Sequence, residues 1–475
     1  MKGGKVAFFK KNIFPWLLTF HLFCMPFSFL FAEELTEFRF SKSDRILILA
    51  PHPDDEVLGC GGIIQKSLSL NLPVRIVFFT YGDFNQWSFL IYRKHLVLGS
   101  QAVERMGLVR YEEAHKAADK LGVPSDQLTF LGYPDFGTQS IWFNHWGEEL
   151  PAVGPLSRAR RVPYANAFRA GALYKGEEIV KDLQSILRDF KPTKIFLSHP
   201  ADFHPDHRCL YLFTLIALWD IEGEFKLPQL FPYLVHFRGW PSPKGLNKTL
   251  KLTPPPALQG QIRWVSEDLD DNQVNKKLEA LKQHKSQYES GASSLKPFIR
   301  KNELFGDFPE VGVGHGTAPS FELENREGFL DFPEQLIEEE KAQFVGVEAR
   351  YIELREDRLI ISFKLSRQLA KEVGLSIQAF GYRKDVPFGQ MPKLCIRVGV
   401  FNYELFEKKR KLPKQTIQVK KEKAWITVSL PLDAMGNPQK VLMSAHTYLS
   451  EIPLDFISWR IVTLPLKNSL ANRNH

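Results

Sequence analysis

Short apolar runs alternate with helix-forming segments through the first half of the chain, and this alternation restricts the fold more than any other feature. Branched and aromatic residues fill four runs of strand length, at 45–50, 73–80, 128–134 and 193–198. Segments of helical composition lie between them, at 61–70, 111–123 and 176–190. Strands that alternate with helices in this way build a parallel sheet packed against helices. The sequence therefore predicts an α/β domain with a mostly parallel sheet.

Two clusters of histidine and acidic residues follow two of these predicted strands directly. HPDDE at 52–56 comes after the first run, and SHPADFHPDH at 198–207 comes at the end of the last. In open parallel sheets, ligands bind outside the carboxyl ends of the strands. Three consecutive acids repel one another, so a positive charge is expected among them.

Together the two clusters contain the side chains of a catalytic metal site. A catalytic zinc takes three protein ligands and leaves one position for water. His52 and Asp55 are three residues apart, as are His204 and His207, and Asp54 lies beside the first pair. A spare carboxylate can accept a proton from water, and a spare histidine can donate one to a leaving amine. The alternative is that such acids are solvated turn residues or helix caps, but two clusters after two strands favour a metal-dependent hydrolase.

The sequence resembles the PIG-L/LmbE-like family of zinc-dependent de-N-acetylases over residues 44–306. APHPDDEVLGCGG at 50–62 resembles the first family signature, and the second, P-x-D-x-HPDH, is matched at 200–207. RYEEA at 110–114 and LGYPD at 131–135 resemble two further family segments. The resemblance implies a Rossmann-like catalytic domain that removes the N-acetyl group from an N-acetylglucosamine-type amino sugar in a glycan or glycolipid.

The resemblance also implies a metal site and a general base. His52, Asp55 and His207 would hold the metal. Zn²⁺ is the expected ion and Fe²⁺ is the alternative, because two histidines and one carboxylate suit both. Asp54 would be the general base that activates water.

The remaining matched positions are expected to serve the reaction or the substrate. By the resemblance, His204 would stabilise the oxyanion or protonate the leaving amine, and Asp206 would orient His204. Arg110 and Asp135 are expected to border the substrate pocket.

Residues 137–175 interrupt the alternation and are expected to form a long insertion. The segment is rich in aromatic residues, arginine, glycine and proline. Trp142 and Trp146 are expected to stack on sugar faces, and Arg160 to meet a phosphate or carboxylate of the substrate. The alternative is that the aromatic residues pack the insertion down and the arginines are solvated.

Residues 1–32 are predicted to direct export. Four lysines precede an apolar stretch at 13–31, which is the pattern of a secretory signal cleaved after Ala32. An N-terminal membrane anchor is the alternative. In either case the protein is expected to be exported, as a periplasmic, extracellular or membrane-anchored protein that faces outward.

Charge and cysteine content argue against nucleic-acid binding, a disulfide framework and a thiolate zinc site. Four of the eight net positive charges lie in the predicted leader, so the rest of the chain carries +4, which gives little reason to expect nucleic-acid binding. Cys60, Cys209 and Cys395 remain after the leader, with no CxxC motif. Neither a disulfide framework nor a thiolate zinc site is expected.

From about residue 343 the apolar pattern changes to a period of two. The segment 349–366 predicts a hairpin that turns at Glu356 and Asp357, and further strands are predicted at 393–401, 423–432, 440–449 and 456–464. The expected organisation is a deacetylase domain at 40–306, a linker at 307–342 and a β-sandwich-like domain at 343–470. The last domain is expected either to bind carbohydrate or to serve as a packing or partner module.

Two other functions stay open. A zinc amidohydrolase that acts on another N-acyl conjugate would share the site and differ in the insertion. A non-catalytic glycan-binding protein would have a damaged metal site, whereas this sequence has a residue of the expected type at each metal position of the resemblance.

Overall fold

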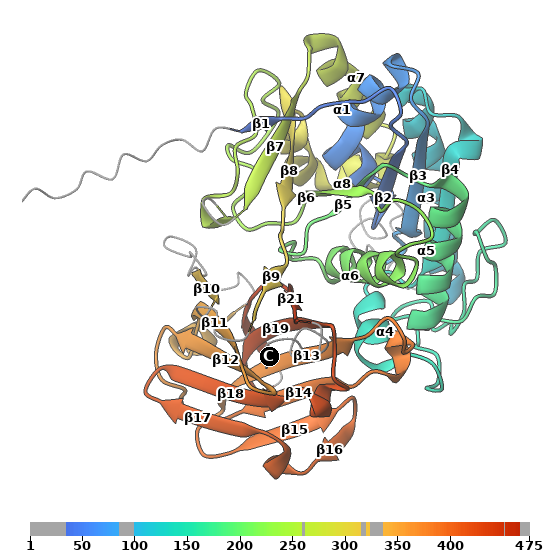
Figure 1. The fold of residues 1–475 in the computed structure, drawn as a ribbon. Coiled ribbons are helices and arrows are strands. Elements are labelled where there is room, and N and C mark those ends of the chain that lie inside the picture. Colours follow the sequence, from blue (N-terminus) through green and yellow to red (C-terminus); the bar gives the residue numbers. More distant parts are fainter. Residues whose placement is uncertain are drawn as a thin grey trace, which may run out of the picture. The chain divides into compact units, whose positions relative to one another are not determined.

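A mostly parallel sheet of eight strands builds the first part of the fold (Figure 1). Its order is β1-β7-β8-β6-β5-β2-β3-β4, and the five strands from β6 to β4 run parallel to one another. The strands are β1 (Thr36–Glu37), β2 (Ile46–Ala50), β3 (Val74–Thr80), β4 (Leu128–Tyr133), β5 (Lys194–Ser198), β6 (Gln229–Tyr233), β7 (Arg263–Asp268) and β8 (Asn302–Asp307). The four runs of strand length correspond to β2, β3, β4 and β5, so the predicted α/β fold is confirmed.

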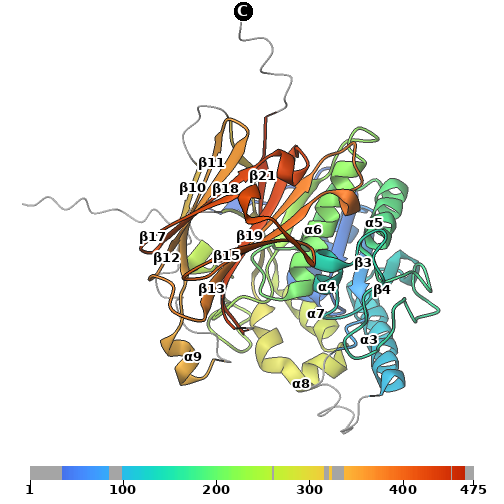
Figure 2. The same ribbon diagram turned by 90° about the horizontal axis from the view of Figure 1, so that it is seen from below.

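The helices of this region form two groups that pack against the sheet. One group is α1 (Asp55–Ser69), α3 (Ser100–Leu121), α7 (Asp271–Leu281) and α8 (Lys285–Leu295), and the other is α4 (Thr138–Asn144), α5 (Gly176–Phe190) and α6 (Pro205–Asp220). Figure 2 shows α5 and α6 on one face of the strands and α3 and α7 on the other. Because helices cover both faces, β2 is buried throughout, which explains its continuous apolar sequence.

The order of the strands creates a switch point between β2 and β5. From β2 the chain adds β3 and β4 on one side, and from β5 it adds β6 on the other. Loops after two such strands diverge and leave a crevice at the carboxyl edge of the sheet. Both histidine–acid clusters follow these two strands.

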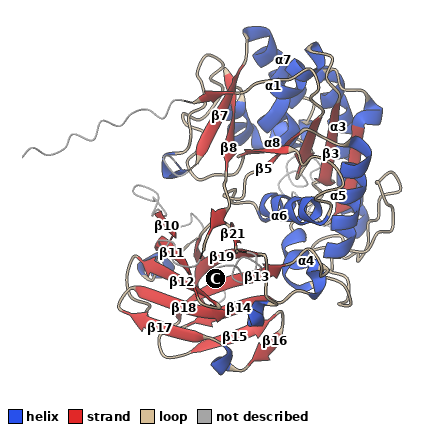
Figure 3. Ribbon diagram, viewed as in Figure 1, coloured by secondary structure: helices blue, strands red, loops and turns tan. Residues whose placement is uncertain are grey.

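Two mainly antiparallel sheets build the second part of the fold, where strands predominate (Figure 3). The first has the order β10-β11-β12-β18-β17, and the second has the order β16-β15-β14-β13-β19-β21-β9, with β20 paired to β19. The first contains β10 (Ser320–Leu323), β11 (Val347–Arg355), β12 (Arg358–Leu365), β17 (Gln418–Glu422) and β18 (Trp425–Pro431). The second contains β9 (Val311–Gly312), β13 (Val373–Tyr382), β14 (Lys393–Val398), β15 (Tyr403–Glu407), β16 (Arg410–Leu412), β19 (Lys440–Leu449), β20 (Ile452–Phe456) and β21 (Arg460–Thr463). Both sheets contribute apolar side chains to one core, as the prediction of a sandwich-like fold requires.

The segment 307–342, predicted as a linker, is in part a component of these sheets. It supplies β9, which pairs with β21, and β10, which pairs with β11, and it ends with the short helix α9 (Glu338–Ala342). The sequence of the segment is rich in glycine, proline and acids and has no period of two, so its pairing depends on the strands that it joins.

The computed structural model describes residues 35–84, 99–258, 262–314, 320–323, 336–450 and 452–465. The predicted leader or anchor at 1–32 lies outside these residues. Among the helices that the structure describes, none has both the length and the apolar character needed to cross a membrane.

The core of the α/β region continues into the C-terminal sheets. The described residues from 35 onward belong to one compact unit. Phe380 and Tyr382 of β13, with Trp459, belong to the same buried cluster as the α/β core. Trp219 of α6 packs on Tyr382, with ring centroids 4.8 Å apart. The second sheet is therefore packed onto the α/β region rather than tethered to it.

Candidate active site

The two histidine–acid clusters meet at the switch point of the parallel sheet. His52 and Asp54 lie on the loop between β2 and α1, and His204 and His207 lie at the start of α6, which follows β5. β2 and β5 are hydrogen-bonded neighbours. Residues 150 positions apart in the sequence therefore face one another at the carboxyl edge of the sheet, as predicted from the pattern.

Asp55 lies between histidines that come from different clusters. Its Oδ2 atom is 3.2 Å from His52 Nδ1 and 3.2 Å from His207 Nε2. All three side chains are buried. The approach to His207 is close but out of hydrogen-bond alignment, so this buried nitrogen has no proper hydrogen-bond partner among the described residues. Two nitrogens and a carboxylate in this arrangement suit a divalent cation.

Three overlapping sets of side chains have ligand atoms within 4.8 Å of one another. They are His52–His204–His207, His52–Asp135–His204–Asp206 and Asp55–His207–His236. His207 occurs with His52 in one set and with Asp55 in another. His207 is therefore close to His52 and to Asp55, although no single set among the described residues contains all three predicted ligands.

In His207 and in His52, the ring nitrogen that is not next to Asp55 has a carboxylate beside it. Asp202 Oδ2 is 3.1 Å from His207 Nδ1, and Asp135 Oδ1 and Asp206 Oδ2 are 3.2 Å and 3.3 Å from His52 Nε2. Such carboxylates fix the orientation of a ligating ring and raise its basicity. Burial opposes protonation of His207, but Asp202 and Asp55 outweigh burial and raise the pKa of the ring to about 9. A metal ion and a proton would compete for this ring.

Asp54 lies beside the cluster in a strained backbone conformation. Its φ of 130° is rare outside glycine, and such strain costs on the order of 1–3 kcal/mol. Its backbone N–H donates to Glu56 Oε2 at 2.8 Å, and its Oδ1 lies 3.4 Å from Arg110 Nη2. Burial raises the pKa of Asp54 to about 7, although Arg110 acts in the opposite direction. A carboxyl group with a pKa near neutrality can accept and release a proton.

His204 caps the N-terminus of α6 and faces the cluster. Its Nδ1 accepts the backbone N–H of Asp206 at 3.3 Å, so the proton of the neutral ring is on Nε2. Burial, reinforced by the neighbouring His52, holds the pKa of His204 well below its usual range. The ring centroids of His52 and His204 are 4.6 Å apart. His204 therefore presents a neutral N–H donor next to the predicted metal ligands.

The structure corrects the role predicted for Asp206. Its Oδ2 lies closer to His52 Nε2, at 3.3 Å, than to His204 Nδ1, at 3.9 Å. It also accepts the N–H of Phe136 at 2.7 Å and the hydroxyl of Thr138. Because His204 Nδ1 is already occupied by the backbone N–H of Asp206, the carboxylate extends past it. The carboxylate of Asp206 therefore supports His52, and its backbone N–H supports His204.

Arg110 and Asp135, predicted to border the substrate pocket, are buried within the cluster, where they contact Asp54 and His52. They are 3% and 4% exposed. The Arg110 guanidinium donates to two loop carbonyls and approaches Asp54, and the Asp135 carboxylate accepts a loop N–H and contacts His52. Both side chains hold the loops that carry the site.

Trp142 and Trp146 are core residues, so the prediction that they stack on sugars is wrong. They are 0% and 1% exposed. The ring of Trp142 packs against Phe380 and Trp459, with centroids 5.9 Å from each. The C-terminal sheet thus covers the ring face that a sugar would need. Arg160 is exposed and donates to a carbonyl of the same insertion.

Sequence reasoning missed two residues of the site, His236 and Asp202. His236 follows β6, a short strand of sequence QLFPY in which a proline hides the strand pattern. The strand is parallel to β5, so its carboxyl end brings His236 to the same edge. Asp202 is the first aspartate of the matched P-x-D-x-HPDH signature. Its position two residues before His204 could have identified it as a site residue.

The comparisons with known proteins cover the part of the chain that carries the two histidine–acid clusters. Residues 47–218 match the family model of PIG-L, described as GlcNAc-PI de-N-acetylase. A 1D-myo-inositol 2-acetamido-2-deoxy-alpha-D-glucopyranoside deacetylase of Mycobacterium sp. (strain KMS) is 30% identical over 189 residues, which are 39% of this chain and 53% of that protein. The corresponding deacetylase 1 of Saccharopolyspora erythraea is 27% identical over 191 residues, which are 40% of this chain and 58% of that protein. The chain therefore spans little more than half the length of these curated relatives.

Among solved structures, N,N'-diacetylchitobiose deacetylase from Pyrococcus horikoshii aligns with 54% of this chain and 75% of its own chain, at 20% identity and a TM-score of 0.32. The family match covers most of β2, all of β3, β4 and β5, the loop with His52 and Asp54, Asp55 at the start of α1, and the start of α6. Residues 47–218 of this chain belong to the PIG-L/LmbE-like family of de-N-acetylases.

Proposed function

We propose that the protein is a metal-dependent hydrolase that removes the N-acetyl group from an N-acetylglucosamine-type amino sugar in a glycan or glycolipid. The observation that carries the proposal is the convergence of Asp55 with nitrogens of His52 and His207 beside the buried carboxylate of Asp54. Hydrolysis of an amide by water needs an electrophilic centre and an adjacent base, and this arrangement supplies a place for both.

His52, Asp55 and His207 would hold the ion, with Zn²⁺ expected and Fe²⁺ as the alternative. The fit rests on the buried His207 nitrogen that lies 3.2 Å from Asp55 without hydrogen-bond alignment. When bound, the ion would polarise the amide carbonyl and lower the pKa of a water molecule. Asp202 behind His207 keeps that ring oriented and basic.

Asp54 takes the proton from the attacking water in this proposal. Arg110 approaches its Oδ1, and the Glu56 carboxylate holds its backbone N–H, so the side chain has little freedom to turn away. The φ angle of Asp54 is strained. Backbone strain of this kind is common at active sites, where it positions a side chain for the reaction at a cost in stability.

His204 donates a hydrogen bond from Nε2 to the amide oxygen as water adds to the carbonyl carbon, and the proton that Asp54 took from water passes to the leaving nitrogen as the C–N bond breaks. Its Nδ1 is committed to a backbone N–H, which sets the tautomer that this role needs. The group that fixes this tautomer is the backbone N–H of Asp206 in α6, and not a side-chain carboxylate.

The choice of an amino sugar is supported by the family description and by the names of the curated relatives. The leader-like composition of residues 1–32 supports export, so the proposed substrate is a glycan or glycolipid outside the cytoplasm.

Chelation tests this proposal. The full chain should contain one metal ion and release acetate from N-acetylglucosamine oligomers or an N-acetylglucosaminyl glycolipid, because hydrolysis depends on the ion. Chelator treatment followed by gel filtration should abolish acetate release, and added Zn²⁺ or Fe²⁺ should restore it. Acetate release that survives complete removal of metal would contradict the proposal, as would metal-loaded, folded protein that deacetylates no N-acetyl amino sugar.

A further inference from the structure

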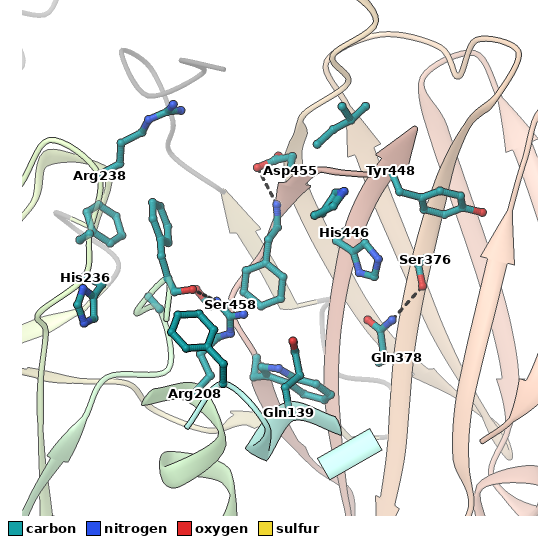
Figure 4. A pocket seen from close by; sticks show the side chains of 18 of the residues that line it. Gln139, Arg208, His236, Arg238, Ser376, Gln378, His446, Tyr448, Asp455 and Ser458 are labelled. Atoms are coloured by element: carbon teal, nitrogen blue, oxygen red, sulfur yellow. Dashed lines mark hydrogen bonds between the residues drawn. The ribbon is translucent and has the colours of Figure 1, made fainter. Parts of the chain in front are cut away.

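A large cavity adjoins the candidate active site and extends to the C-terminal sheet. Its volume is about 1250 Å³, above the roughly 300–1,000 Å³ that is usual for small-molecule pockets. His236, which shares a set of ligand atoms with Asp55 and His207, lines it. Figure 4 shows His236 and Arg238 on one side of the cavity and strand residues of the C-terminal sheet on the other. The cavity has room for several sugar units.

The far wall of the cavity is the polar face of β13, β14 and β19. Successive residues of a strand point to opposite faces of a sheet. In β13, Leu375 and Ile377 belong to the core between the two C-terminal sheets, whereas Ser376 and Gln378 line the cavity. Ser376 and Gln378 are nevertheless buried, and buried polar groups are costly unless they find partners. β13 therefore has an apolar face toward the core and a polar face toward the cavity.

The strand register gathers the polar side chains of this wall into one row. Ser376 is opposite Arg397 of β14 and opposite His446 of β19. Gln378 donates to Ser376 Oγ at 2.9 Å. Figure 4 shows Ser376, Gln378 and His446 together on neighbouring strands. Three strands thus present hydroxyl, amide, imidazole and guanidinium groups at one place.

An aromatic ring lies next to this row. Tyr448 of β19 is opposite Gly374 of β13, and a Cβ at position 374 would be 2.4 Å from the Tyr448 ring. Glycine at this position lets the ring lie against the strand. A partly exposed aromatic ring beside polar groups is a common way to contact a sugar face.

Positive charge predominates around the cavity. Among the described lining residues, the cations are Arg208, Arg238, Lys244, Lys393, Arg397 and Lys408. The one carboxylate among them is Asp455, and its Oδ2 accepts the N–H of Val347. Lys408 pairs with Glu149, and burial holds the pKa of Lys393 well below its usual range, so neither is counted. Of the others, Arg208, Lys244 and Arg397 are three cations against one carboxylate.

The electrostatic environment of His446 agrees with this excess. Burial lowers the pKa of His446 to about 4, and Arg397 and Arg208 act in the same direction. Both arginines therefore project positive potential into the part of the cavity next to the polar row. A ligand with negative charge would be favoured there.

We propose that this cavity binds the part of the substrate beyond the N-acetylated sugar, and that this part is an anionic oligosaccharide carrying carboxylate or phosphate groups. The inference rests on the proposed function for the location of the reacting sugar. The C-terminal sheet then forms one wall of the substrate site, with Arg397 as a residue that determines specificity. It does not act as a separate carbohydrate-binding module.

The test compares three oligosaccharides of equal length with the full chain. One is a neutral N-acetylglucosamine oligomer, the second alternates N-acetylglucosamine with glucuronic acid, and the third carries phosphate on its non-acetylated sugars. We expect lower KM for one of the anionic oligomers, and the better of the two identifies the charged group. Arg397→Gln should reduce the ratio of kcat/KM for anionic over neutral substrate by about tenfold, because it removes one charge-assisted hydrogen bond. Arg410→Gln is the matched control, since Arg410 pairs with Glu407 on the neighbouring strands and does not line the cavity.

A binding measurement separates this inference from the proposed function. The Asp54→Asn protein, titrated calorimetrically with the same oligomers, should bind the anionic ones more tightly, and Arg397→Gln should remove that preference even if no acetate is ever released. Equal affinity for neutral and anionic oligomers would overturn the inference, and so would an Arg397→Gln protein that keeps the anionic preference.

Discussion

Replacing Asp54 with asparagine is expected to lower kcat for acetate release by about 10²- to 10⁴-fold, the usual contribution of a general base. Asparagine has nearly the same shape as aspartate but cannot take the proton from water. KM should change little, because Asp54 contacts Arg110 and loop groups of the protein. Metal content should stay at the level of the unchanged protein, since Asp54 is not among the proposed ligands.

Asp126→Asn is a suitable control for this variant. Asp126 is exposed and lies on a surface turn before β4, so its substitution should leave kcat and thermal stability as they are. Acetate release by Asp54→Asn at the rate of the control would show that another group accepts the proton.

Replacing Asp55 with asparagine is expected to have the second large effect, on metal binding. Asp55 supplies the carboxylate that lies 3.2 Å from nitrogens of both His52 and His207. Loss of a carboxylate that only supports a ligating histidine typically costs about 10- to 100-fold in metal affinity. Loss of a ligand should cost more than about 100-fold on the same scale. Zn²⁺ competition against a chromogenic chelator measures the difference, and acetate release should fall in parallel.

Asp202→Asn provides the graded comparison. Asp202 lies 3.1 Å from His207 Nδ1, on the side of the ring away from Asp55. Its substitution should weaken Zn²⁺ binding by about 10- to 100-fold, which is less than the loss for Asp55→Asn. Both variants should be checked for thermal unfolding, because Asp202 also accepts loop N–H groups. If Asp202→Asn lost more metal affinity than Asp55→Asn, the assignment of Asp55 as a ligand would be wrong.

The parts of the site that sequence could predict are those that follow from local pattern and strand direction. The apolar runs that became β2 and β5 are continuous because both faces of the sheet are covered. Parallel strands bring the residues after them to one edge, so His52, Asp55 and His207 could be placed together without any knowledge of distances.

The errors have a common physical cause, which is packing between distant parts of the chain. Trp142 and Trp146 are the residue type of a sugar-binding surface, but Phe213 of α6 and the C-terminal sheet, both distant in sequence, cover their rings and make them core residues. The partner of Asp206 depends on which nitrogen of His204 accepts the α6 backbone, and sequence does not contain that choice.

β13 was missed for a related reason. Its sequence, VGLSIQAFGY, contains two glycines and polar residues of low strand propensity, yet every residue is buried. One face packs in the core between the C-terminal sheets and the other lies against the cavity and the α/β region. The polar residues on the cavity face of β13 would contact the proposed anionic substrate, and that contact would account for polar residues in a strand that is buried on both faces.

Anomalous X-ray diffraction at the zinc absorption edge, from crystals of the full chain soaked with Zn²⁺, tests the central claim most directly. The account predicts one anomalous peak bounded by His52, Asp55 and His207, at about 2.0–2.2 Å from each ligand atom. A peak instead on the other side of His52, between Asp135 and Asp206, with none beside Asp55, would contradict it.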